Sequence, residues 1–313
     1  MKRLRARFSA AQIMWLTIAL LLPGALMQAW LFGIAVLLQV VLAMGFAIAT
    51  EALCSPAARL NPRRLLDGSS ALTAALIALA LPAGVPWPVL LIAITAGLGL
   101  GKFAYGGLGN NLFNPAMVGY LVVLVSFPQH LAAWPLLDGM TGATPLDALR
   151  HRGGVTIAEF AAGNAHGQYG GFGWESINIG YLLGGIALLL LRIAHWRVPL
   201  AVFAGLGLCA LLGYDNGSSS SHGAPLFHWL TGATCMTAFF VATDPVTQPS
   251  APKAQWLFGL LIGALIYAIR SFGSYADGAA FAILLANACA PLLQAQAMAS
   301  AERARSVRNG VDL

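Results

Sequence analysis

Long apolar runs separated by short polar segments dominate the chain. Only a helix satisfies its own backbone hydrogen bonds inside a bilayer, and about 20 residues are needed to cross one. Ten runs approach that length, and they cover residues 11–29, 31–50, 69–84, 86–101, 114–128, 176–194, 197–213, 225–242, 254–270 and 278–297. The pattern therefore predicts an all-α polytopic membrane protein with about ten transmembrane helices. The third and fourth runs are short and are separated only by residues 82–88.

Composition supports this interpretation. Charged residues make up 9% of the 313 residues, against about 25% in soluble domains, and hydrophobic residues make up 58%, with a mean hydropathy of +0.76. These values exclude an ordinary soluble enzyme, a disordered chain and a nucleic-acid-binding module. The four cysteines contain no Cys-x-x-Cys pair, which argues against a disulfide scaffold, a zinc site or an iron–sulfur cluster held by this chain alone; they are Cys54, Cys209, Cys235 and Cys289.

The net charge of +6 is best explained by membrane orientation. If the N-terminus is cytoplasmic and ten spans alternate, 14 of the 17 Lys and Arg residues fall on the cytoplasmic side. Cytoplasmic loops of membrane proteins carry such an excess. Both termini are therefore expected in the cytoplasm, and the long connection after the fifth span is expected outside. Residues 1–29 also resemble a cleavable signal peptide, but a second apolar run follows at once and favours a retained span.

Weak internal similarity suggests a repeat. Lys102 and Phe113 have the same spacing as Arg270 and Phe281, 168 residues later, and Thr73-Ala74 and Ala78 match Thr237-Ala238 and Ala242, 164 residues later. Two halves of five spans must have opposite orientations, as in many transporters, although chance could also produce so few identities. The predicted organisation is a first five-helix repeat (1–127), an outer loop (128–175), a second repeat (176–297) and a cytoplasmic tail (298–313).

The outer loop contains the segment Asp138-Gly-Met-Thr-Gly-Ala-Thr-Pro-Leu146. Glycines allow positive φ angles and close approach to a bulky group. Asp138 could accept hydrogen bonds from the turn, and a proline after Thr144 is typical of the first position of a helix. From the residues alone, this segment predicts a surface turn that presents the hydroxyls of Thr141 and Thr144.

The same segment resembles a flavinylation motif. Asp138, Gly139, Thr141, Gly142, Ala143 and Thr144 match the pattern Asp-Gly-x-(Ser/Thr)-Gly-Ala-Thr of the B subunit of the sodium-translocating NADH:quinone reductase and of the D subunit of the Rnf electron-transport complex. The resemblance implies that a flavin transferase outside the cytoplasmic membrane joins FMN to Thr144 through a phosphoester. Chain length and Thr141 make the chain more similar to the Rnf D subunit.

The resemblance extends over most of the chain and also implies a fold and a function. The fold would be that of urea transporters, with two inverted five-helix repeats. The function would be that of a flavoprotein in the cell inner membrane that passes electrons between redox centres, coupled to Na⁺ or H⁺ transport. Its partners would be the other Rnf subunits, the lipid bilayer and, during maturation, the flavin transferase, and the subunit would not be catalytic alone. The alternative is a urea-transporter-like channel without a redox centre.

The run Gly109-Asn-Asn-Leu-Phe-Asn-Pro-Ala116 also belongs to the resemblance. Asn114 and Pro115 are typical of a helix start. In this family a second, non-covalent flavin such as riboflavin is possible, which makes Asn110, Asn111 and Asn114 candidate ligands.

Other polar segments have simpler interpretations. Gly232 and Ala233 in Thr231-Gly-Ala-Thr are expected to pack helices closely, and Asp244 is expected to be a solvated charge at a helix end. Lys102, Arg270 and Asp277 are expected to snorkel from the membrane edge. No compact metal site is expected from the loop histidines, which are His130, His151 and His166, and the glycine-rich residues 167–173 are expected to form a loop that covers the flavin.

Overall fold

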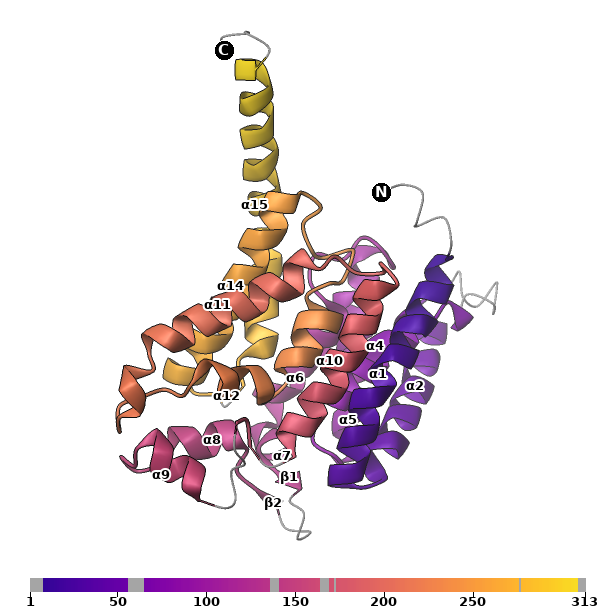
Figure 1. Ribbon diagram of the computed structural model, residues 1–313. Helices are drawn as coiled ribbons and strands as arrows, with labels where there is room; N and C mark the ends of the chain where they lie inside the picture. Colours follow the sequence, from indigo (N-terminus) through magenta and orange to yellow (C-terminus); the bar gives the residue numbers. More distant parts are fainter. Residues whose placement is uncertain are drawn as a thin grey trace.

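The computed structural model describes residues 8–55, 65–135, 141–163, 169–171, 173–275 and 277–308. These residues form a bundle of helices that lie roughly side by side, with a set of short elements across one end (Figure 1). Asp138, Gly139 and His166 lie outside the described residues, as do residues 167, 168 and 172.

The first half of the chain supplies five main helices. They are α1 (Ala10–Phe32), α2 (Ala35–Cys54), α4 (Ser69–Ala80), α5 (Trp87–Gly101) and α6 (Pro115–Ser126), and the short helix η3 (Phe103–Tyr105) follows α5. Asn114 caps α6 as predicted, because its Oδ1 accepts hydrogen bonds from the N–H groups of Ala116 and Met117 at 3.0 and 3.3 Å.

The connection between the halves carries α7 (Pro128–Ala132), β1 (Trp134–Pro135), β2 (Thr141–Gly142), α8 (Pro145–Arg150) and α9 (Ile157–Ala162). Strands β1 and β2 pair antiparallel, with Trp134 opposite Gly142. The second half supplies α10 (Trp174–Leu190), α11 (Arg197–Leu212), η4 (Asp215–Gly217), α12 (Pro225–Leu230), α13 (Thr234–Met236), the π-helical η5 (Thr237–Val241), α14 (Pro252–Phe272) and α15 (Ala279–Arg308).

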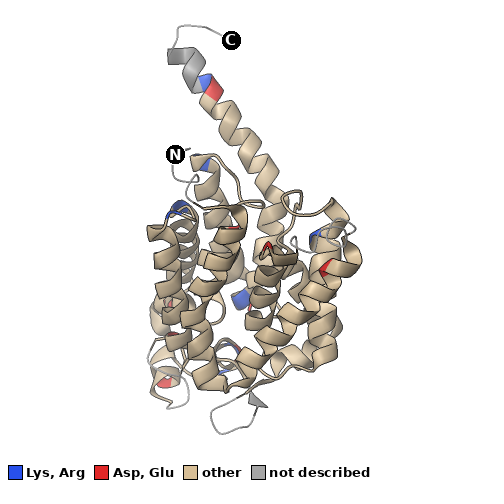
Figure 2. Ribbon diagram, turned by 90° about the vertical axis from the view of Figure 1, so that its right-hand side faces the viewer, with Lys and Arg blue, Asp and Glu red and all other residues tan. Residues whose placement is uncertain are grey.

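Several of these helices can cross a membrane. Five segments of the described chain are long and apolar enough, namely Ala10–Phe32, Ala35–Cys54, Trp87–Tyr105, Pro252–Phe272 and Ala279–Arg303, and α4, α6, α10 and α11 are shorter apolar helices. Charged residues are few along the bundle, most of which is formed by other residues (Figure 2). The chain is therefore a mostly helical, polytopic membrane protein.

Close packing joins helices from the two halves. Helix α1 packs along α10 and α6 contacts α15, while α5 packs on α6 and α11 on α14 within each half. At Gly97 on α5, an added Cβ would lie 2.7 Å from the carbonyl oxygen of Pro115, so a larger residue would force α5 and α6 apart. Small residues promote this kind of approach between helices in membranes.

The eighth apolar run is not one helix. Helix α12 ends at Leu230, Thr231 is extended, and Gly232 has a φ of +60° before the chain turns helical again at Thr234. The expectation that Gly232 and Ala233 pack helices closely is therefore wrong, because these residues form a break. Asn178, which is fully buried on α10, holds the break through bonds from its Nδ2 to the carbonyls of Leu230 and Gly232, each at 3.0 Å.

Lys102 does not snorkel to the membrane edge. Its side chain is buried, and Nζ lies 3.2 Å from Glu51 Oε1 and donates to the hydroxyls of Ser69 and Ser70, both at 2.8 Å. Arg270 is buried as well, against Asp277. The snorkelling interpretation is wrong because each cation has an acidic partner inside the bundle.

Candidate functional site

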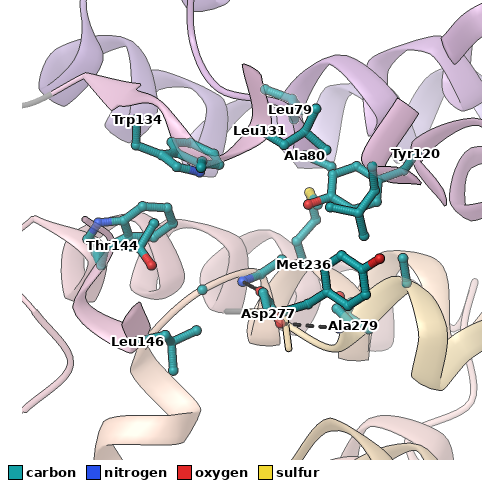
Figure 3. Close-up of a pocket in the computed structure, with 18 of the residues that line it drawn as sticks. Leu79, Ala80, Tyr120, Leu131, Trp134, Thr144, Leu146, Met236, Asp277 and Ala279 are labelled. Atoms are coloured by element: carbon teal, nitrogen blue, oxygen red, sulfur yellow. Dashed lines mark hydrogen bonds between the residues drawn. The ribbon is translucent and has the colours of Figure 1, made fainter. Parts of the chain in front are cut away.

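A cavity of about 310 Å³ (Figure 3) opens at one end of the bundle. Figure 1 shows α7, α8 and the strand pair at this end. We call it the outer cavity, after the side of the membrane on which the charge bias predicts it. Its walls are aromatic and apolar with a few polar groups, and they include Tyr120, Leu131, Trp134, Thr144, Leu146, Trp174, Met236, Tyr275 and Asp277. Small-molecule sites have this character and typically measure about 300–1,000 Å³.

Thr144 lies at the wall of the outer cavity, at the start of α8. Its hydroxyl oxygen accepts a hydrogen bond from the N–H of Asp147 at 3.3 Å, and Pro145 occupies the first helical position. The predicted helix start is confirmed. Thr144 is half-buried and Ala143 is exposed. The helix thus fixes the direction of the Thr144 hydroxyl while leaving it accessible.

Aromatic side chains form the wall next to the motif. The rings of Trp134 and Trp174 meet edge to face with centroids 4.9 Å apart, and Phe32 contacts them at 5.6 and 5.7 Å. Strand β2, which contains Thr141 and Gly142, pairs with the strand that carries Trp134. The motif is therefore attached by backbone pairing to an aromatic cluster that can stack on a flat ring.

The charged floor of the outer cavity was missed by the sequence interpretation. Asp277 Oδ1 lies 3.1 Å from Arg270 NH2 and accepts the N–H of Ala279, while Oδ2 accepts the N–H of Ala233 at 2.9 Å. Figure 3 shows Asp277 facing the space that Thr144 also borders. The sequence did contain a signal for Arg270, because the spacing between Arg270 and Phe281 repeats that between Lys102 and Phe113.

The outer loop is fastened to the bundle beside the cavity. Arg152 donates to the carbonyl of Leu149 at 2.9 Å, to Ser219 at 2.7 Å and to Ser221. Glu175 accepts the N–H groups of Tyr169 and Gly170, both at 2.8 Å, within the described part of the glycine-rich stretch. The covering role of residues 167–173 stays a prediction.

A second cavity, of about 390 Å³, lies at the opposite end of the bundle, near the start of α1; we call it the inner cavity. Asn111 and Asn114 line it, whereas Asn110 is exposed and lies outside the lining. Asp244 also lines it, and is not a freely solvated charge: its carboxylate accepts bonds from the N–H of Val246 and from Thr247, each at 3.1 Å. The expectation of a solvated charge at Asp244 was therefore wrong.

No metal centre is evident in the described ranges. They contain no group of three or more His, Cys, Asp or Glu residues able to hold an ion. His151 lies 3.3 Å from Asp147 on the surface of α8. The outer cavity, with the Thr144 hydroxyl, the aromatic wall and the Arg270–Asp277 pair, is therefore the candidate functional site.

Comparison with known proteins shows which family the chain belongs to. The family model described as "NQR2, RnfD, RnfE family" matches residues 3–301. The D subunit of the ion-translocating oxidoreductase complex of Aeromonas hydrophila is 41% identical, covering 90% of this chain and 91% of the relative. The corresponding D subunits of Ectopseudomonas mendocina and Vibrio cholerae are 43% and 39% identical, covering 90% and 93% of this chain and 88% and 94% of the relatives. The chain thus belongs to the NQR2, RnfD, RnfE family.

Proposed function

We propose that the chain is the D-type membrane subunit of an ion-translocating oxidoreductase complex and that it carries FMN joined covalently to Thr144. The observation that carries this proposal is the position of the Thr144 hydroxyl, which lies within a matching flavinylation motif and at the wall of a cavity. The relatives are named as subunits of an ion-translocating oxidoreductase complex, so the chain acts with other subunits and not as a catalyst alone.

The residues of the outer cavity fit a flavin. A planar ring can stack on the cluster of Trp134 and Trp174, and the polar edge of the ring can meet Tyr120 and Asp277. The hydroxyl of Tyr181, also a lining residue, is buried and has no hydrogen-bond partner within the described chain. FMN would supply the electron-transfer chemistry, and the protein would supply attachment, orientation and local charge.

The arrangement of the two cavities supports an inverted repeat of five helices, as in urea transporters. Residues 164 positions apart line the two cavities, and the pairs are Ile13 and Ile177, Thr17 and Tyr181, Ser69 and Ala233, Leu72 and Met236, and Thr73 and Thr237. Gly68 and Gly232, also 164 apart, both have positive φ angles, of +79° and +60°. Because the cavities lie at opposite ends, the halves would have opposite orientations.

The inner cavity is the proposed site of a second, non-covalent flavin such as riboflavin. Asn111 and Asn114 line it together with Lys102, Asp244 and Arg192. The Asn114 Nδ2 lies 3.5 Å from Asp244 Oδ2, so a ligand could draw on a donor and an acceptor held side by side. Two flavins at the two ends would let electrons pass across the membrane plane, and coupling to Na⁺ or H⁺ movement would occur in the complex.

Orientation follows from the charge bias. Helix α1 begins and α15 ends at the same end of the bundle, and the motif lies at the other end (Figure 1). With both termini in the cytoplasm, Thr144 would face the outside of the inner membrane, where a flavin transferase can reach it.

The test is covalent flavin fluorescence in denaturing gels after co-expression with a flavin transferase. Thr144→Ala should abolish the fluorescent band, and Thr141→Ser should keep it. Asp138→Ala should weaken it by impairing recognition of the motif. Fluorescence that persists in Thr144→Ala would refute the attachment site, and a wild-type chain without fluorescence would favour a transporter without a redox centre.

A further inference from the structure

The Arg270–Asp277 pair is built into the break of the eighth apolar run. Arg270 uses all three of its nitrogens: Nε and NH2 bond Asp277, NH1 bonds the carbonyl of His228 at 2.9 Å, and NH2 also bonds the Thr234 hydroxyl at 3.0 Å. The side chain of Arg270 is 1% exposed and that of Asp277 is 23% exposed. Arg270 is therefore enclosed by protein, and the Asp277 carboxylate is the more exposed group of the pair.

The Asp277 carboxylate borders the outer cavity. Asp277 belongs to the cavity lining and Arg270 does not. Among the described lining residues, the other charged side chain is Asp147, which is more exposed and lies beside His151 on the surface. A charge acts more strongly where water is excluded, so Asp277 is the group best placed to influence a bound molecule electrostatically.

Gly232 lies between this pair and the helix that carries Thr144. A Cβ built on Gly232 would lie 2.5 Å from Asp277 Oδ2, 2.8 Å from Arg270 NH2 and 2.9 Å from Leu146 Cδ1. Leu146 is two residues beyond Thr144 on α8. The attachment helix and the carboxylate thus both lie next to the backbone of Gly232, on the border of the cavity that Thr144 also lines.

A second polar group faces the same space. Tyr120 on α6 lines the outer cavity, and Figure 3 shows its side chain directed into it. Its hydroxyl makes no hydrogen bond to the described part of the chain. A hydroxyl and a fixed carboxylate that border one aromatic-walled cavity indicate a ligand with both acceptor and donor groups on its rim.

We propose that Asp277, held by Arg270, and Tyr120 are positioning residues for the flavin ring and set its reduction potential in opposite directions. This inference rests on the proposed function. The oxidised ring carries carbonyl acceptors and an N–H donor, and it gains electron density on reduction. A nearby carboxylate disfavours added negative charge and lowers the potential, whereas a hydroxyl that donates to the ring favours it and raises the potential.

The experiment is a spectroelectrochemical titration of the assembled complex, with the FMN of this subunit resolved by its covalent fluorescence. Asp277→Asn removes the negative charge next to Arg270 and should shift the midpoint potential to more positive values. Tyr120→Phe removes only the hydroxyl and should shift it to more negative values. Asp147→Asn, a carboxylate on the exposed rim, is the matched control and should give a smaller shift than Asp277→Asn.

The outcomes separate this inference from the attachment itself. Retained covalent fluorescence with unchanged potentials in both variants would overturn the role of Asp277 and Tyr120 and leave Thr144 untouched. Shifts of the midpoint potential in the same direction in both variants would also overturn it. Such shifts would indicate a general loosening of the cavity and no separate roles for the two side chains. An equal shift in Asp147→Asn would overturn it as well, because the potential would then follow the charge of the loop. If the complex with Asp277→Asn does not assemble, the Tyr120→Phe variant alone decides. A midpoint potential that then moves to more positive values, or does not move, refutes the proposal.

Discussion

Substitution of Gly232 by alanine tests the break that supports the outer cavity. A non-glycine residue in the left-handed region costs roughly 1–2 kcal/mol, and Gly232 has a φ of +60°. The new methyl would also lie 2.5–2.9 Å from Asp277, Arg270 and Leu146. Overpacking of this kind costs about 1–3 kcal/mol. The folded state should therefore lose about 2–5 kcal/mol in Gly232→Ala.

Gly84 provides the matched control. Its φ is +77°, but no atom lies within 4 Å of the position that a Cβ would take. Gly84→Ala should therefore lose only the backbone contribution of roughly 1–2 kcal/mol. The assay is the temperature at which half of the detergent-solubilised protein leaves the folded peak in size-exclusion chromatography. Equal losses of thermal stability in the two variants would refute the packing of Asp277 and Leu146 against Gly232.

Three further predictions follow from buried polar groups and from topology. Asn178→Leu leaves the Leu230 and Gly232 carbonyls without their side-chain donor, which costs roughly 1–3 kcal/mol each. The melting temperature of this variant should therefore fall well below that of the wild type, and an unchanged melting temperature would contradict the role of Asn178. Lys102→Met should cost about 3–5 kcal/mol of folding stability, because it leaves the buried Glu51 carboxylate without its cation. Adding Glu51→Gln should recover part of this loss, and a double variant no more stable than the single one would refute the coupling. Reporter fusions should be active in the cytoplasm at the C-terminus and outside near residue 151, and the reverse pattern would invert the topology.

Hydropathy predicted most of the helices because the signal is local. Residues 10–32 and 252–272 are apolar over a whole span, and the structure has a helix in each place. The break at Gly232 was not predicted, because residues 225–242 are predominantly apolar and composition alone does not show where a helix is interrupted. Its causes are tertiary: the amide of Asn178 and the side chains of Arg270 and Asp277 satisfy the freed backbone groups.

The candidate site was predictable only in part, for a similar reason. Thr144 is identified by a continuous motif, and its helix start is visible in the proline that follows. The other walls of the outer cavity come from α6, β1, α10 and the segment before α15, which packing brings together. The burial of Lys102 and Arg270 was not predicted, because their acidic partners are distant in the sequence or cannot be identified from it. The matched spacing of these two cations was the available clue.

Mass spectrometry of the purified subunit tests the central claim most directly. After co-expression with a flavin transferase, the intact chain should carry the added mass of one phosphoester-linked FMN, and fragmentation of the peptide around residues 141–150 should place that mass on Thr144. An unmodified chain under these conditions, or FMN located on another residue, would contradict the account.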